Sequence, residues 1–200
     1  ERITVVPEAA GLRHDVLMRD ELWPAPYAVA VGTIQPRKNI EIASRAFGES
    51  KFSSYGTLLV IGAIGYRGSH IVRSVRAGRN SDRVRFLGRV SDDVLHALIS
   101  NAEFLLAPSL DEGFGLPALE AMSLGVPVVA STGGALPELV GEAGLLVDPI
   151  DPESIRVAID RLAEDAQLRG ELRQRGLLRA SSYTWSRTAR ETLAVYEMVA

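Results

Sequence analysis

The chain contains no cysteine among its 200 residues. This absence excludes disulfide bonds and thiolate metal sites, and it fits a reducing compartment such as the cytoplasm. Histidine is scarce too, and the three present are scattered without the spacing of a metal site or a proton relay. His96 falls in a predicted helix, where we expect it on the surface or in a groove. The sequence has no Asp-x-Asp motif either, so we predict that the protein requires no metal.

The chain also lacks a surplus of basic residues, since 22 Lys and Arg are set against 25 Asp and Glu. Nucleic acid is therefore not expected as a partner, although a local positive cleft stays open. No apolar run approaches the length that spans a membrane, and the chain does not open on a secretory signal. We expect a soluble, cytoplasmic globular protein with no membrane contact evident in this chain.

Short apolar runs alternate with helical stretches along most of the chain. The runs at residues 27–31, 57–61, 84–87, 104–107, 127–130 and 144–147 are typical of buried strands. The helical stretches lie at residues 40–47, 69–77, 91–100 and 117–124. This alternation predicts an α/β fold with a Rossmann-like parallel sheet and helices on both faces. In such a fold, ligands bind at the carboxyl ends of the strands.

Glu112 and Glu120 stand eight positions apart in residues 111–122, which read DEGFGLPALEAM. The glycines let a ligand approach the backbone, and Pro117 suits the first turn of a helix. The free amides of that turn and the helix dipole favour an anion such as phosphate. The two carboxylates are better suited to accept hydrogen bonds from sugar and ribose hydroxyls. The segment therefore predicts a nucleotide-sugar site, with Glu120 about two turns along the helix.

Three motifs, taken in order, resemble those of the retaining GT-B glycosyltransferases of family 4. The segment with Glu112 and Glu120 resembles the E-x7-E motif of that family. Residues 32–39, GTIQPRKN, resemble its first strand-to-helix loop, and residues 126–138, VPVVASTGGALPE, resemble the loop after the motif helix. The resemblance runs from about Ile3 to the C-terminus in the family's order and spacing.

Enzymes of this family consist of two Rossmann-like domains that face each other across a cleft, and the C-terminal domain holds the nucleotide-sugar. The resemblance covers only that C-terminal half, so we interpret the chain as lacking the N-terminal acceptor domain. We expect one donor-binding domain, with a leading segment at residues 1–26, a βα core at 27–150 and a helical tail at 151–200. The last helix resembles the one that crosses back toward the other domain.

The resemblance assigns roles to the charged residues of the site, and the candidate catalytic residues are Glu112, Lys38 and Arg37. Glu112 would contact the hydroxyls of the donor sugar, and Glu120 would hold the ribose hydroxyls. Lys38 would meet the diphosphate, where a cation stabilises the charge that develops as the glycosidic bond breaks. The family often carries an arginine where this chain has Thr33, and whether Arg37 replaces it is left open.

The other expected donor contacts are made by backbone or lie near the base. Residues 113–116 match the backbone that offers amides to the diphosphate, and Arg89 and Val90 match the segment along the base. The two glycines after the fifth strand would line the pocket. The full set of donor-binding predictions besides Glu120 is Gly32, Thr33, Arg89, Val90, Gly113, Phe114, Gly115, Leu116, Gly133 and Gly134.

The resemblance implies a retaining hexosyltransferase that uses a nucleotide-diphosphate sugar and no further cofactor. Residues 36–39, PRKN, resemble a subgroup rich in mannosyltransferases of surface-polysaccharide synthesis, so GDP-mannose is the favoured donor. The acceptor would be a glycan or a lipid-linked molecule bound through the missing N-terminal domain. This chain alone should therefore transfer almost nothing, and peripheral contact with the inner membrane face is expected only for the full-length protein.

Two alternatives stay open beside transfer, namely a nucleotide-sugar-binding module and a GT-B epimerase. A Rossmann-like fold hosts many functions, so the fold alone does not separate them. A dinucleotide-binding domain is excluded, because the chain continues after Val31 with GTIQP instead of G-x-G-x-x-G. An acceptor-domain glycine-rich loop in the N-terminal half would favour transfer.

Overall fold

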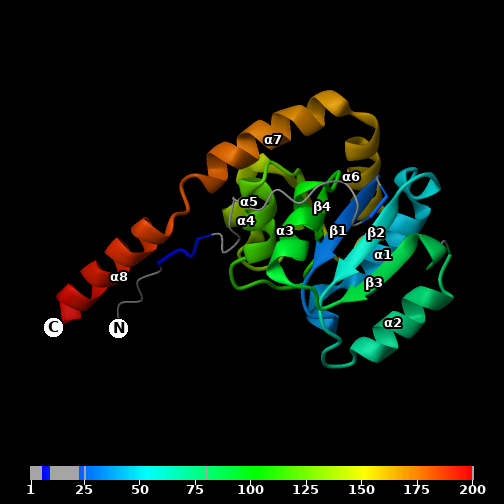
Figure 1. Ribbon diagram of the computed structural model, residues 1–200, viewed down its shortest axis with the longest axis horizontal. Coiled ribbons are helices and arrows are strands. Elements are labelled where there is room, and N and C mark those ends of the chain that lie inside the picture. Colours follow the sequence, from blue (N-terminus) through cyan, green and yellow to red (C-terminus); the bar gives the residue numbers. More distant parts are fainter. Residues whose placement is uncertain (1–5, 10–22, 25, 80, 200) are drawn as a thin grey trace.

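The structure, a computed structural model, describes residues 6–9, 23–24, 26–79 and 81–199 (Figure 1). Most of the expected leading segment, residues 1–26, therefore lies outside the described residues. The rest forms a central sheet between two layers of helices, followed by a helical tail that extends to one side (Figure 1).

The sheet has six parallel strands in the order β3-β2-β1-β4-β5-β6. Each predicted strand is present, and the boundaries differ from the expectation by about one residue. The order reverses between β1 and β4, which pair through Val29 and Leu105. The strands are β1 (Tyr27–Val31), β2 (Thr57–Ile61), β3 (Val84–Gly88), β4 (Leu105–Ala107), β5 (Val128–Ser131) and β6 (Leu145–Val147).

The helices cover both faces of the sheet, as predicted. On β1, Ala28 and Ala30 pack toward α1, α2 and α6, whereas Val29 packs toward α3, α4 and α5. Both faces of a strand are thus buried, which explains why the strands read as continuous apolar runs. The helices of the two layers are α1 (Ile40–Glu49), α2 (Gly68–Ala77), α3 (Asp92–Ser100), α4 (Leu116–Ser123), α5 (Leu136–Val140) and α6 (Pro152–Glu164). The short 3-10 helices are Pro36–Lys38, Phe52–Ser54, Ser81–Arg83 and Gly141–Ala143.

The tail is helical, as predicted, and consists of α7 (Ala166–Ala180) and α8 (Trp185–Val199) after α6. Asp151 and Asp165 cap α6 and α7 by accepting hydrogen bonds from backbone amides of the first turn. Helix α8 extends away from the sheet and runs beside residues 6–9 (Figure 1). There the Thr188 hydroxyl donates to the carbonyl of Pro7 over 2.6 Å.

Two local expectations were wrong. Helix α5 was not predicted, because its five residues, LPELV, are too few to show a helical period. His96 is buried with 6% of its surface exposed, since it lies among the residues of α3 that turn toward the core. An apolar stripe on a short helix is broad enough to bury a neighbouring polar residue, and the sequence does not show which one.

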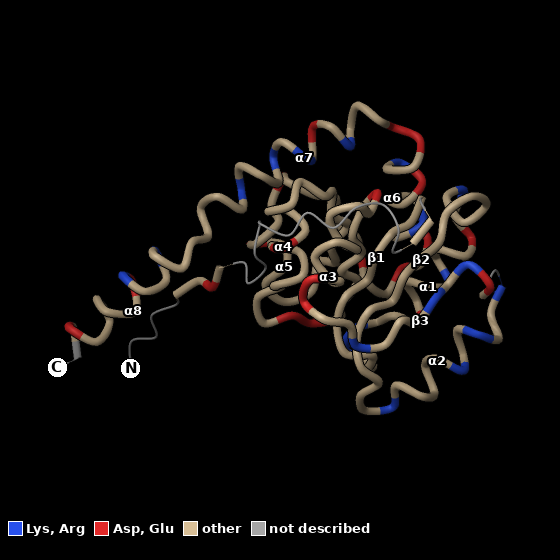
Figure 2. Tube along the Cα trace, in the orientation of Figure 1, with Lys and Arg blue, Asp and Glu red and all other residues tan. Residues whose placement is uncertain are grey.

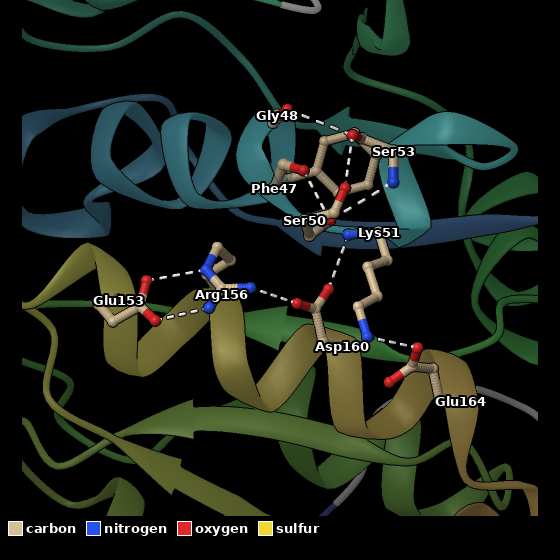
Figure 3. A network of polar contacts seen from close by, with 9 residues as sticks. All are labelled: Phe47, Gly48, Ser50, Lys51, Ser53, Glu153, Arg156, Asp160 and Glu164. Atoms are coloured by element: carbon tan, nitrogen blue, oxygen red, sulfur yellow. Dashed lines mark hydrogen bonds and ion pairs between the residues drawn. The ribbon is translucent and has the colours of Figure 1, made fainter.

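A polar network joins α6 to the end of α1 at the edge opposite to the carboxyl ends of the strands (Figure 3). Asp160 is buried, and its carboxylate accepts from the Lys51 backbone amide over 2.7 Å and also from the guanidinium of Arg156. A buried carboxylate with two donors is satisfied, so this network fastens α6 to the end of α1 within one helical layer. The nearby Lys51–Glu164 ion pair is exposed and contributes little.

Among the described residues, none of the helices combines the length and the apolar content needed to cross a lipid bilayer.

Candidate functional site

The candidate site lies where the strand order reverses, between the loops that follow β1 and β4. Crossovers leave such neighbouring strands in opposite directions, so a crevice opens at their carboxyl ends. The two loops are hydrogen-bonded to each other, with the Leu110 amide donating to the Arg37 carbonyl over 2.8 Å. The Arg37 guanidinium in turn donates to the Asp111 carbonyl over 2.5 Å. The site is therefore a junction of two segments that are 74 positions apart in the chain.

Lys38 and Glu112 form an ion pair at this junction. The Lys38 ammonium lies 2.6 Å from Oε2 of Glu112, and both side chains are largely buried, with 13% and 14% exposed. The same oxygen accepts a hydrogen bond from the Ser109 hydroxyl over 2.9 Å. The Arg37 guanidinium lies 3.5 Å from the other carboxylate oxygen and is 43% exposed. Two predicted catalytic cations and the predicted catalytic carboxylate thus meet at one point.

Burial by itself would raise the pKa of Glu112. The hydrogen bond and the charge of Lys38, the Ser109 hydroxyl and the charge of Arg37 outweigh that effect and hold the pKa below its ordinary value of 4.5. The carboxylate is therefore ionised at neutral pH, and it accepts hydrogen bonds without donating any.

This lowered pKa predicts a pH dependence of stability. Because the folded pKa lies below the unfolded one, the charged Glu112 stabilises the fold above pH 4.5, and the stabilisation is lost as pH falls through the folded pKa. The free energy of unfolding of wild type and Glu112→Gln should be measured in urea from neutral to acidic pH. We expect the advantage of the wild type to shrink below pH 4.5. A difference that stays constant over the whole range would contradict the assignment.

The amino end of α4 follows Glu112 directly. Gly115 is its N-cap in the left-handed region, with φ 102°, and Pro117 stands in the first turn. The first amides of a helix have no intrahelical acceptor, and they can donate to an anion. Leu116 is 38% exposed beside them, and the Phe114 ring packs edge-on against Tyr183 at 5.9 Å. This end of the helix thus fits the predicted diphosphate contact.

Glu120 lies on α4 four residues after the first helical residue, so it is about one turn into the helix. The sequence placed Glu120 about two turns along the helix, which is the distance counted from Glu112. The helix begins only at Leu116, so the structure leaves about one turn. The Glu120 side chain is partly exposed. The two motif glutamates therefore flank the amino end of α4, one in the loop before it and one beyond its first turn.

The two glycines after β5 hold the Glu112 loop in place. A Cβ on Gly134, which has φ +60°, would meet the Glu112 carbonyl oxygen at 2.3 Å and its amide at 2.5 Å. A Cβ on Gly133 would meet the Leu110 carbonyl oxygen at 2.4 Å. The Ala135 amide also donates to the Glu112 carbonyl over 2.8 Å. These glycines permit close backbone contact behind the glutamate.

The glycine after β1 contacts the site lysine. A Cβ on Gly32 would come within 3.0 Å of Cε of Lys38, so this glycine leaves room for the lysine stem. The neighbouring Thr33 packs against the loop after β2, where a Cβ on Gly65 would meet its methyl group at 2.5 Å. Thr33 therefore supplies a packing contact and no charge to the site.

The predicted base contacts follow β3, which β2 and β1 separate from β4. Arg89 is exposed, whereas Val90 is half-buried against the core cluster that includes α3 and α4. They lie at the same edge of the sheet as Lys38 and Glu112 but are not joined to the ion pair by hydrogen bonds in the described part of the chain.

Gly113, in the loop before α4, faces open space, because a Cβ there would meet nothing within 4 Å.

Lys38, Ser109, Glu112, Gly115 and Pro117 line a small cleft. A larger hollow of about 490 Å³ lies between α1 and α2, where Glu41 and Arg45 line it. That hollow is on the outside of a helix layer, away from the carboxyl ends of the strands where ligands of this fold bind. The small cleft is therefore the candidate site.

Charge is unevenly distributed over the surface. Arginines gather along α2 and β3 and also on α7, whereas acidic residues are frequent on α6 and in the loop before α4 (Figure 2). A net charge of −3 thus conceals a basic flank that begins at the loop after β2.

The sequence did not indicate two of the polar groups at the junction. Ser109 follows the predicted strand at residues 104–107 and was assigned no role, and Asn39 entered only as part of the first loop. Their contacts join residues far apart in the chain, and a strand-end position was the only local signal for Ser109. Among the described residues, no group of three His, Asp or Glu side chains is arranged to hold a metal ion.

Comparison with known proteins gives a family for this arrangement. The family model described as glycosyl transferases group 1 matches residues 25–165. The C-terminal domain of the glycosyl transferase group 1 family protein LpcC from Francisella tularensis superposes with a TM-score of 0.69 at 26% identity. That match covers 78% of this chain and 85% of the LpcC domain.

Curated relatives are longer than this chain. It is 36% identical over 196 residues to the O-antigen chain mannosyltransferase B of Escherichia coli, which covers 97% of this chain and 51% of that protein. It is 43% identical over 121 residues to the MMP alpha-(1->4)-mannosyltransferase of Mycolicibacterium hassiacum, which covers 58% of this chain and 29% of that protein. The chain thus spans about half the length of the first relative.

Proposed function

Since the chain belongs to the group 1 glycosyltransferases and corresponds to their C-terminal domain, we propose that it binds the donor of a retaining hexosyltransferase. The donor would be a nucleoside diphosphate sugar. The observation that carries the proposal is the Lys38–Glu112 pair beside the amino end of α4. A cation, helix amides and a carboxylate at one point suit a phosphate and a sugar hydroxyl side by side.

In the proposed reaction the bond from the sugar to the diphosphate breaks, and negative charge grows on the departing phosphate oxygen. Lys38 and the amides around Gly115 stabilise that charge. Arg37 is the second cation, because its guanidinium already lies 3.5 Å from Glu112. The acceptor hydroxyl adds on the same face, and its proton passes to the departing phosphate oxygen, so the anomeric configuration is retained.

Glu112 orients the sugar through its hydroxyls, and Glu120 holds the ribose. Lys38 pairs with Glu112 in this structure, so it has to divide its hydrogen bonds between the carboxylate and the diphosphate when donor binds. An ammonium has three donors, which allows both contacts at once. Lys38 therefore contacts the phosphate side of the bond that breaks, and Glu112 contacts the sugar side.

Mannose is the favoured sugar, because two relatives of this chain are mannosyltransferases. Guanosine is the favoured base, because residues 36–39, PRKN, resemble a mannosyltransferase subgroup for which GDP-mannose is the favoured donor. The acceptor, a glycan or a lipid-linked molecule, would contact an N-terminal domain outside this chain. We therefore propose that this chain binds donor weakly and transfers almost nothing alone.

Calorimetric titration of the chain with guanosine and uridine diphosphates tests donor binding. We expect guanosine diphosphate to bind, and Glu120→Ala to weaken binding by about 10-fold because a ribose contact to a charged acceptor is lost. Glu171→Ala, on an exposed part of α7, is the matched control and should leave binding unchanged. Preference for uridine diphosphate would overturn the choice of base.

Failure of both nucleotides to bind this chain and the full-length protein would overturn the donor site itself. A transfer assay on the full-length protein then separates the alternatives. Retention of nucleotide binding with no transfer to any mannan or lipid-linked acceptor would favour a nucleotide-sugar-binding module or an epimerase.

A further inference from the structure

Asn39 joins the loop that carries Lys38 to the start of α1. It has φ 54° and ψ 30°, and only Asn39 and Arg67 among the described non-glycine residues have a positive φ. Asparagine is one of the few side chains that tolerate this left-handed region. Its backbone amide donates to the Pro36 carbonyl over 3.0 Å and closes the short helix that contains Lys38.

The side chain of Asn39 links three loops at the carboxyl edge of the sheet. Its amide nitrogen donates to the Pro108 carbonyl over 3.0 Å and to the Pro149 carbonyl over 2.7 Å. Those carbonyls lie after β4 and after β6, whereas Asn39 itself follows β1. Both hydrogens of the amide are used, and the residue is buried with 6% of its surface exposed.

The residues beside these hydrogen bonds are the ones that contact Glu112. Lys38 precedes Asn39, and Ser109 follows Pro108. The Lys38 ammonium and the Ser109 hydroxyl both donate to Oε2 of Glu112, over 2.6 Å and 2.9 Å. A shift between the two loops would move these donors relative to each other, and the amide of Asn39 opposes that shift.

No other side chain meets all these requirements. Glycine would keep the left-handed backbone but remove both donors. Aspartate would tolerate the backbone but place carboxylate oxygens against two carbonyl oxygens, which repel it. Residues with a larger or branched side chain would be strained at this φ. The position thus requires a short amide.

We propose that Asn39 is a positioning residue that sets Lys38 for the donor diphosphate by fixing the loop after β1 against the loops after β4 and β6. The inference rests on the proposed function in one respect, namely that Lys38 meets the diphosphate. The placement of Lys38 against Glu112 can be measured without any nucleotide.

The first test compares a nucleoside diphosphate with its monophosphate, using guanosine nucleotides, or uridine nucleotides if the wild type prefers that base. Only the diphosphate carries the second phosphate for Lys38. The Kd of the monophosphate divided by the Kd of the diphosphate therefore reports the placement of the lysine. We expect Asn39→Gly to reduce that ratio by about 10-fold, the effect of about two hydrogen bonds. Monophosphate binding should change little.

Asp160→Asn is the control for a merely structural effect. Asp160 lies in the buried network at the opposite edge of the sheet, so its substitution lowers stability without touching the site. We expect it to leave the ratio of Kd values unchanged. An equal change of the ratio in Asp160→Asn and Asn39→Gly would overturn the inference.

The second test uses the two lysines of the chain, Lys38 and Lys51. Reductive methylation with carbon-13 formaldehyde labels both ammonium groups and keeps their charge. In spectra recorded without nucleotide, we expect the Lys38 methyl resonance to move toward that of a solvent-exposed lysine in Asn39→Gly. Lys51 is remote from the site, so the chemical shift of its methyl resonance should not change.

The two tests separate the inference from the proposed function. If neither this chain nor the full-length protein binds either nucleotide, the proposed function fails, and the Lys38 resonance alone decides the positioning. An unmoved Lys38 resonance together with an unchanged ratio of Kd values would overturn the role of Asn39. If Asn39→Gly does not fold, Asn39→Ser serves instead, because its single hydroxyl can keep at most one of the two hydrogen bonds, and it should displace Lys38 in the same direction by a smaller amount.

Discussion

Replacing Lys38 by methionine is expected to weaken binding of the nucleoside diphosphate by about 10- to 100-fold, the range that hydrogen bonds to charged groups supply. Methionine keeps the length and apolar stem of the side chain, so the contact of that stem with Gly32 survives. The monophosphate should lose much less affinity. Calorimetric titration of both nucleotides measures the difference.

The same substitution leaves Glu112 without its nearest cation. A largely buried carboxylate beside the diphosphate would repel it, so part of the loss comes from Glu112 and not from the missing lysine contact. We therefore expect the double variant Lys38→Met, Glu112→Gln to regain part of the diphosphate affinity. A double-variant cycle separates the two effects.

Lys51→Met is the matched control, because Lys51 is the other lysine of the chain and its ion pair with Glu164 is exposed. It should bind both nucleotides as the wild type does. If Lys38→Met bound the diphosphate as tightly as Lys51→Met, the assignment of the diphosphate to the loop after β1 would be wrong.

Gly134→Ala is expected to lower the free energy of unfolding by about 2–4 kcal/mol, from strain at a positive φ and from overpacking. The Cβ of the new alanine would lie 2.3 Å from the Glu112 carbonyl oxygen. This atom belongs to the backbone, so it cannot rotate away as a side chain can. The Glu112 loop must therefore move, so we also expect weaker diphosphate binding. Urea unfolding and titration measure the two effects.

Gly113→Ala provides the comparison in the Glu112 loop, which Gly134 contacts. A Cβ on Gly113 meets nothing within 4 Å, so we expect its free energy of unfolding to stay close to that of the wild type. Equal destabilisation by the two substitutions would show that glycine is required in this loop for a reason other than close backbone contact with Gly134.

Much of the fold was predictable because its signals are local. The run at residues 27–31 is apolar on both faces and ends at a glycine, which suffices to predict a buried parallel strand. Asp151 followed by Pro152 is likewise a local signal, because an N-cap aspartate and a proline in the first turn mark the start of α6. Helix α5 and the burial of His96 were missed, because a short helix has no clear period and burial depends on the neighbouring layer.

The amino-acid sequence by itself determined where the six strands and most of the helices lie along the chain. It also determined the glycine turn before α4 and the identity of the charged residues near that turn. Each of these follows from the chemistry of neighbouring residues. Only the tertiary structure decided that Lys38 and Glu112 form a pair, since 74 positions separate them and the adjacency of β1 and β4 brings them together. The same holds for Asn39, whose amide reaches carbonyls 69 and 110 positions away. A hydrogen bond requires two groups within about 3 Å, and for residues so far apart that distance is set by the packing of the whole sheet.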